Sequence, residues 1–118
     1  MIRDRRSGSD RRSKVRYATE IEIEWEGAAG RETGTISDLS ETGCFVLCSG
    51  DVEDGEAIKL IFSLANNRTI ALSGTVVNHI YEIGYAMRFA EHLGANEQHF
   101  LDKLIEHLER TGNLHSGR

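Results

Sequence analysis

The sequence contains no proline, only two cysteines and no long run of apolar residues. A helix needs about 20 apolar residues to cross a bilayer, so we expect no membrane insertion. The basic N-terminus is not followed by the apolar stretch of a signal peptide, and two cysteines do not make a disulfide framework. We therefore expect a cytoplasmic protein. The absence of proline is compatible with fully paired β-strands.

The composition is that of one globular domain, with 118 residues of which 39% are apolar and 28% are charged. Its net charge of −5 is unevenly distributed. Residues 1–16 carry seven basic and two acidic side chains, whereas residues 17–118 carry seven basic and seventeen acidic ones. An acidic body repels a nucleic acid polymer, but a local arginine cluster can bind a small phosphate ligand. We therefore predict a flexible arginine-rich arm over 1–16, a folded domain over 17–112 and a tail over 113–118.

Six short segments have the apolar pattern of β-strands. In the first, Ile21, Ile23 and Trp25 alternate with glutamates, which predicts a strand with one buried face. The six strands are expected over about residues 20–26, 31–37, 44–47, 58–64, 69–79 and 83–89. Gly74 is a candidate bulge or bend, and Asn66-Asn67 a hairpin turn. This spacing of short strands predicts an all-β antiparallel barrel or sandwich.

A single amphipathic helix is expected over about residues 96–110. Asn96 is the expected N-cap and Gly112 the expected stop. The apolar positions follow helical spacing and form one stripe, made of Phe100, Leu101, Leu104, Ile105 and Leu108. The stripe can be buried by packing across an open end of the barrel, and helix–helix dimerisation is the alternative.

A pair of arginines lies where the arm meets the first strand, in Arg12-Ser13-Lys14-Val15-Arg16. No other two arginines of the chain are four positions apart. Each guanidinium is a planar fork of donors that matches phosphate oxygens or the O6/N7 edge of guanine. Arg12 and Arg16 are therefore candidate ligands for one anion.

A second polar motif, Asp38-Leu39-Ser40-Glu41-Thr42-Gly43, connects the second and third strands. The carboxylate of Asp38 can accept from the N1–H and N2–H₂ groups of guanine, and the hydroxyl of Ser40 can donate to phosphate. Gly43 permits a positive φ and a close backbone approach. Alone, such a string is typical of an ordinary turn. The order of the two motifs around the first strand pair is more specific than either one.

The order of these features resembles the PilZ domain over about residues 10–110. The chain has Arg-x-x-x-Arg, two strands, Asp-x-Ser-x-x-Gly, further strands and a C-terminal helix. The segment 83–89, Ile-Gly-Tyr-Ala-Met-Arg-Phe, is also similar to the last strand of that family. The resemblance implies a six-stranded antiparallel β-barrel that binds the bacterial second messenger cyclic di-GMP.

The resemblance also implies roles for individual residues. Arg12 and Arg16 would grip guanine and phosphate, while Asp38, Ser40 and Gly43 would meet the ligand from the barrel surface.

Two further positions bear on the ligand. Arg11 precedes the arginine pair, and in the family an arginine there accompanies the binding of two stacked ligand molecules. Many members also have an aromatic residue near the end of the fifth strand that stacks on guanine. This chain reads Val-Asn-His-Ile over 77–80, so that His79 or Tyr81 could stack, or the platform is absent.

We therefore predict a non-catalytic cyclic di-GMP receptor, whose arm orders over the ligand and signals to an unidentified downstream protein. The five histidines and two cysteines show no metal-ligand spacing, and no catalytic fingerprint occurs, so neither an enzyme nor a metal site is expected. One alternative is a PilZ-like interaction module that binds no nucleotide and acts in motility or pilus assembly. A second alternative is a small RNA-binding barrel, which the acidic body argues against.

Overall fold

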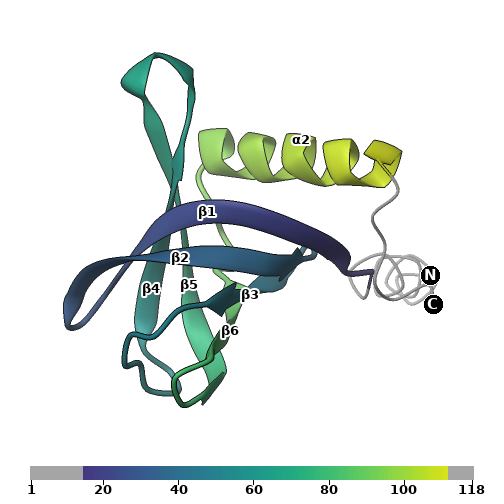
Figure 1. Ribbon diagram of the computed structural model, residues 1–118. Helices are drawn as coiled ribbons and strands as arrows, with labels where there is room; N and C mark the ends of the chain where they lie inside the picture. Colours follow the sequence, from purple (N-terminus) through teal and green to yellow (C-terminus); the bar gives the residue numbers. More distant parts are fainter. Residues whose placement is uncertain (1–14, 112–118) are drawn as a thin grey trace, which may run out of the picture.

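The computed structural model describes residues 15–111, which form a closed β-barrel and one long helix (Figure 1). Neighbouring strands are antiparallel, in the order β1-β2-β3-β6-β5-β4 around the barrel. The elements are β1 (Tyr17–Gly27), β2 (Gly30–Leu39), β3 (Gly43–Leu47), β4 (Ala57–Ser63), the short 3₁₀ helix η1 (Ala65–Asn67), β5 (Thr69–Ile80), β6 (Gly84–Phe89) and α2 (Ala95–Thr111). The predicted six-stranded antiparallel barrel with a C-terminal helix is confirmed.

Strand β1 shows how the alternating pattern builds the barrel wall. Ile23 and Trp25 are buried, while Glu22, Glu24 and Glu26 between and beside them are exposed. The strand begins at Tyr17, earlier than the alternation predicts, because Tyr17 is itself buried in the core. This early start places Arg16 directly before the first strand, where the sequence predicts an anion-binding residue.

Gly74, the candidate bulge or bend, is not a bulge. It pairs in regular register with Ile58 on β4 and Phe89 on β6. A side chain at Gly74 would collide with the main-chain carbonyl of Arg88, so the residue permits close strand packing. The irregularity of β5 lies three residues later, where the pairing with β6 passes over Val77.

The β4–β5 connection is the expected asparagine turn. Asn66 and Asn67 have φ angles of 64° and 60°, in the left-handed region that asparagine tolerates better than most residues. They lie in η1, and the hairpin extends past the barrel on the side of α2 (Figure 1).

Helix α2 begins at Ala95, so the expected N-cap at Asn96 is wrong. The amide of Gln98 donates to the carbonyl of Gly94, which places Asn96 inside the first turn. The expected stop, Gly112, lies outside the described residues.

The apolar stripe of α2 covers one end of the barrel, as expected (Figure 1). Leu101, Ile105 and Leu108 belong to the same buried cluster as the strand residues. Phe100 also packs edge-to-face on Phe62 of β4, with ring centroids 4.9 Å apart. The helix therefore completes the core instead of leaving an apolar face for a second copy.

The barrel interior is packed around Trp25 and Tyr85, whose rings meet edge-to-face at 5.2 Å. Cys44 is also buried in the core, and this burial raises the pKa of its thiol far above the ordinary range. Both cysteines are free, and the core interpretation of Cys44 is confirmed. Between residues 15 and 111, no helix combines the length and apolarity that crossing a membrane requires.

Candidate functional site

One row of residues crosses the outer surface of five strands and defines the candidate site. Successive register partners are Ala18 on β1, Asp38 on β2, Phe45 on β3, Ala86 on β6 and Asn78 on β5. The chain neighbours of Phe45 and of Ala86 are buried, so these two side chains point out of the barrel. Because register partners share a face, the whole row lies on the outside.

Three strands are irregular next to this row. The register shifts between Ala18 and Ile21 in β1, at Ser37 in β2 and at Val77 in β5. An extra residue in a strand reverses which face the following side chains occupy. In β2 the shift allows Ile36 and Leu39 both to be buried while Asp38 points outward. Bulges are enriched at functional sites, and here they turn polar side chains onto one surface.

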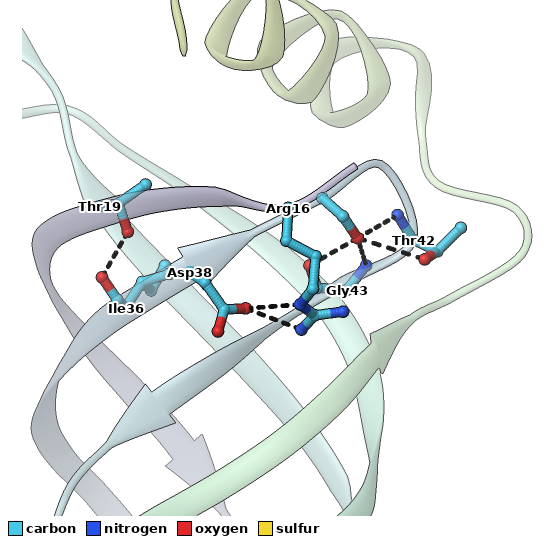
Figure 2. Close-up of polar contacts among 7 residues, drawn as sticks. Arg16, Thr19, Ile36, Asp38, Thr42 and Gly43 are labelled. Carbon is cyan, nitrogen blue, oxygen red and sulfur yellow. Dashed lines mark hydrogen bonds and ion pairs between the residues drawn. The ribbon is translucent and has the colours of Figure 1, made fainter. Parts of the chain in front are cut away.

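The two predicted motifs meet at Arg16 and Asp38. Figure 2 shows the guanidinium of Arg16 against the carboxylate of Asp38, with Nη2 at 2.7 Å and Nε at 3.1 Å from Oδ1. The Arg16 side chain is 42% exposed and that of Asp38 is 21% exposed. The pair therefore lies at the surface, where solvent screening limits its worth to stability to about 1 kcal/mol or less.

Ser40 closes the turn between β2 and β3. Its hydroxyl accepts from the amides of Thr42 and Gly43 at 3.2 and 3.3 Å and lies 3.2 Å from the carbonyl of Gly43, to which it can donate (Figure 2). The side chain is fully buried. The structure thus gives this hydroxyl partners within the turn, and its contact with a ligand phosphate stays a prediction.

Gly43 permits a close backbone approach, but to another strand of the barrel. A side chain there would collide with the main-chain carbonyl of Met87 on β6. Among the described residues, the glycines with positive φ are Gly30, Gly55 and Gly84, so Gly43 does not use the positive φ that glycine permits. Gly43 therefore shapes the site by holding the β2–β3 turn tightly against β6.

Two exposed residues beside the motifs were missed by the sequence interpretation. Asn78 lies in the outer row itself, and Arg88 is the register partner of Gly43. Within residues 15–111, the side chain of Arg88 has no hydrogen-bond or ion-pair partner. The signal for Arg88 is its position between the buried Met87 and Phe89, which predicts an outward side chain. The signal for Asn78 is hidden by the bulge at Val77.

His79 and Tyr81 do not lie in the row of Asp38. His79 pairs with the buried Tyr85, so it faces inward at the mouth of the barrel, and its Nδ1 lies 2.8 Å from Oδ1 of Asp54. Tyr81 lies in the β5–β6 turn and is 75% exposed. The residue of β5 that faces outward beside the site is Asn78, which has no aromatic ring to stack on a base.

The remaining predicted site residues, Arg11 and Arg12, lie outside the described part of the chain. Within that part, no three histidine, cysteine, aspartate or glutamate side chains gather closely enough to hold a metal ion. The arrangement offers a guanidinium, a carboxylate and a free surface arginine across neighbouring strands. Such a set can bind a small ligand that carries both phosphates and hydrogen-bonding bases.

Comparison with solved structures shows the same barrel in other proteins. The PilZ domain of CeSA from a cellulose-synthesizing bacterium has a TM-score of 0.60 and 21% identity, over 80% of this chain and 97% of that one. The inhibitor of motility MotI/DgrA of Bacillus subtilis has a TM-score of 0.66 and 16% identity, over 83% of this chain and 51% of that one. PlzA of Borreliella burgdorferi, solved in complex with c-di-GMP, has a TM-score of 0.63 and 14% identity, over 86% and 43%.

These identities show a shared fold, and the chain spans about half the length of the last two proteins. Comparison with the curated proteins found no match. The family model described as "PilZ domain" matches residues 10–107, which include both motifs and nearly all of the barrel and helix. The chain therefore belongs to the PilZ domain family, a family of cyclic di-GMP receptors.

Proposed function

We propose that this chain is a cyclic di-GMP receptor and adaptor that binds its ligand on the outer row of the barrel. The observation that supports this most is the contact between Arg16 and Asp38. It brings together two motifs that are 22 residues apart in the sequence. Both side chains are partly exposed, so a ligand can reach them from solvent.

The geometry leaves an acceptor at Asp38 and a donor at Arg88 for a ligand that carries guanine and phosphate groups. Nε and Nη2 of Arg16 both approach Oδ1 of Asp38, and Oδ2 has no partner among the described residues. A free carboxylate oxygen can accept from the Watson–Crick edge of guanine. Arg88 lies two strands from Asp38 and two residues further along β6, at about 12 Å given the usual strand spacing and rise per residue, which suits a second anionic or guanine contact.

The arm supplies the remaining contacts in this proposal. Arg11 and Arg12 close over the ligand while Asp38 and Arg16 hold it from the barrel. Charge-assisted bonds contribute about 1.5–3 kcal/mol each, against about 1–2 kcal/mol for each residue that becomes ordered. Since these terms nearly cancel, ligand binding can switch the arm between two states that a downstream protein distinguishes. The protein acts without catalysis and in the cytoplasm, where a second messenger is available to its receptors.

Isothermal titration of the full chain with cyclic di-GMP tests the proposal. We expect micromolar or tighter binding, and a loss of about 10- to 100-fold or more in Arg16→Ala, because charge-assisted bonds are removed. Arg12→Ala should act in the same way. Arg31→Ala is the matched control, since Arg31 is an exposed arginine paired with Glu24 and Glu26 at the other end of β1 and β2.

Two results would contradict the proposal. Undiminished binding in Arg16→Ala would show that the ligand lies elsewhere. An absence of heat with the wild-type chain, together with a stable protein complex, would favour the alternative of a module in motility or pilus assembly that binds no nucleotide.

The same titration reports how many ligand molecules bind. If Arg11 supports a second, stacked cyclic di-GMP, the wild-type stoichiometry is two and Arg11→Ala reduces it to one. An equal stoichiometry in the two proteins would remove Arg11 from the site.

A further inference from the structure

The exposed large apolar side chains of residues 15–111 gather at one end of the barrel. They are Leu47, Val77, Ile80, Tyr81 and Ile83, with exposures of 42–75%. Four of them come from the end of β5 and the turn into β6, and Leu47 ends the neighbouring β3. This turn lies at the end of the barrel away from α2 (Figure 1). Exposed apolar side chains that gather in this way mark an interaction site more often than chance exposure does.

The register explains why these side chains form one surface. Leu47 pairs with Gly84 on β6, and Gly84 pairs with Ile80 on β5. Leu47 and Ile80 therefore lie on either side of Gly84 in one row across three strands. Leu47 and Ile80 lie two positions from Phe45 and Asn78 of the outer row, so this surface continues from the candidate ligand site.

An open groove of about 840 Å³ adjoins the same turn. Ile80 and Tyr81 form one side of it, and the loop 50–56 forms another. One lining residue, His79, is hydrogen-bonded to Asp54. The charged side chains that line the groove are otherwise all acidic, and these are Asp51, Glu53, Asp54, Glu56 and Glu82. No lysine or arginine lines the groove. An apolar surface beside an acidic groove is complementary to a segment that carries both apolar and cationic side chains.

We propose that this end of the barrel, defined by Leu47, Ile80, Tyr81, Ile83 and the acidic groove, docks a basic amphipathic segment of a partner protein. The apolar side chains of that segment cover the β5–β6 turn, and its lysines or arginines enter the groove. A second copy of this chain is disfavoured, because a two-fold contact would place the acidic groove against itself. The chain's own arm is basic but has almost no apolar residues, so it cannot cover the turn.

This inference deepens the adaptor half of the proposed function, and it does not depend on ligand binding. The docking surface lies beside the outer row but shares no residue with it. Failure of the docking proposal and failure of the receptor proposal can therefore be separated by measuring peptide binding and cyclic di-GMP binding on the same variants.

The test uses the full ¹⁵N-labelled chain and a synthetic peptide of about 14 residues, in which leucines occupy one helical face and lysines the other. We expect concentration-dependent chemical-shift changes confined to 47–56 and 77–84. Ile80→Ser combined with Tyr81→Ser should weaken peptide binding about tenfold or more, because it removes the apolar contact area. Cyclic di-GMP binding should be unchanged in this variant.

Charge is tested with a matched pair of variants. Glu82→Lys should weaken peptide binding about threefold or more. Glu91→Lys makes the same change at an exposed position outside the groove and should have no effect. A peptide with glutamate in place of lysine should not bind.

Several outcomes would overturn the proposal. These are chemical-shift changes that spread over the whole surface or centre on α2, binding of the glutamate peptide as tight as that of the lysine peptide, or equal effects of Glu82→Lys and Glu91→Lys on peptide binding. Sedimentation that shows a dimer lost in the Ile80→Ser, Tyr81→Ser variant would identify the surface as a contact between copies, and would also overturn it.

Discussion

The residues of the Asp38–Gly43 segment have different roles at the candidate site. Asp38 presents a carboxylate to solvent, whereas Leu39 is fully buried in the core. Ser40 satisfies the backbone of the turn, and Gly43 permits the turn to pack against β6. The sequence interpretation gives this motif three ligand contacts, at Asp38, Ser40 and Gly43. In the structure Ser40 and Gly43 also shape the turn beside the Asp38 carboxylate, and their own contacts with a ligand stay predictions.

Gly43→Ala should destabilise the protein by about 1–3 kcal/mol, because the added methyl group would overlap the Met87 carbonyl and strands cannot separate freely there. Urea denaturation gives the free energy of unfolding. Ser73→Ala, at an exposed and paired position of β5, is the control and should change it by no more than about 0.5 kcal/mol. A Gly43→Ala protein as stable as the control would show that the glycine is not required by packing.

Whole elements were predictable where a simple period held over several residues. The alternation of Ile21, Ile23 and Trp25 and the helical stripe of α2 both express burial on one side. The bulges were not predictable by that method, because one extra residue reverses the faces and the alternation then fails. The available signal was Ile36 and Leu39, two apolar residues three apart in one strand, both of which are buried.

The same limit explains which site residues were found from the sequence. Arg16 and Asp38 stand out by residue type and spacing, and the structure brings them into contact. Asn78 could not be placed by counting along β5, because the bulge at Val77 changes the face on which it lies. His79 and Tyr81 were considered instead, and both lie away from the outer row.

Helix α2 should be essential to the core. Ile105→Ala should lower the free energy of unfolding by about 2–5 kcal/mol, because Ile105 is 2% exposed and its loss leaves a cavity under the helix. His99→Ala on the exposed face should change stability by about 0.5 kcal/mol or less. If the two variants had similar, small effects, the helix would not seal the barrel.

On the scale of the whole molecule, two surfaces differ in their charge and shape. The candidate site combines Asp38 of the outer row with Arg16 and Arg88 beside it, while the groove at the β5–β6 turn is lined by carboxylates. The seventeen acidic residues of 17–118 repel a long polyanion, because most of its phosphates would lie near the acidic barrel and out of reach of the few arginines. A ligand with only two phosphates can lie within reach of those arginines alone. The whole-molecule charge therefore favours a small dinucleotide over RNA.

Salt dependence distinguishes these two kinds of ligand. Raising NaCl from about 50 to about 500 mM should weaken cyclic di-GMP binding by no more than about tenfold, because few charges are neutralised and the contacts are short-ranged. Single-stranded RNA of about 12 nucleotides should show no binding even at the lower salt, since the acidic barrel repels its backbone. Titration calorimetry for the dinucleotide and fluorescence anisotropy for the RNA measure both. RNA binding that falls steeply with salt, with little response to cyclic di-GMP, would mean that the arm recognises a polymer and that the acidic body does not exclude it.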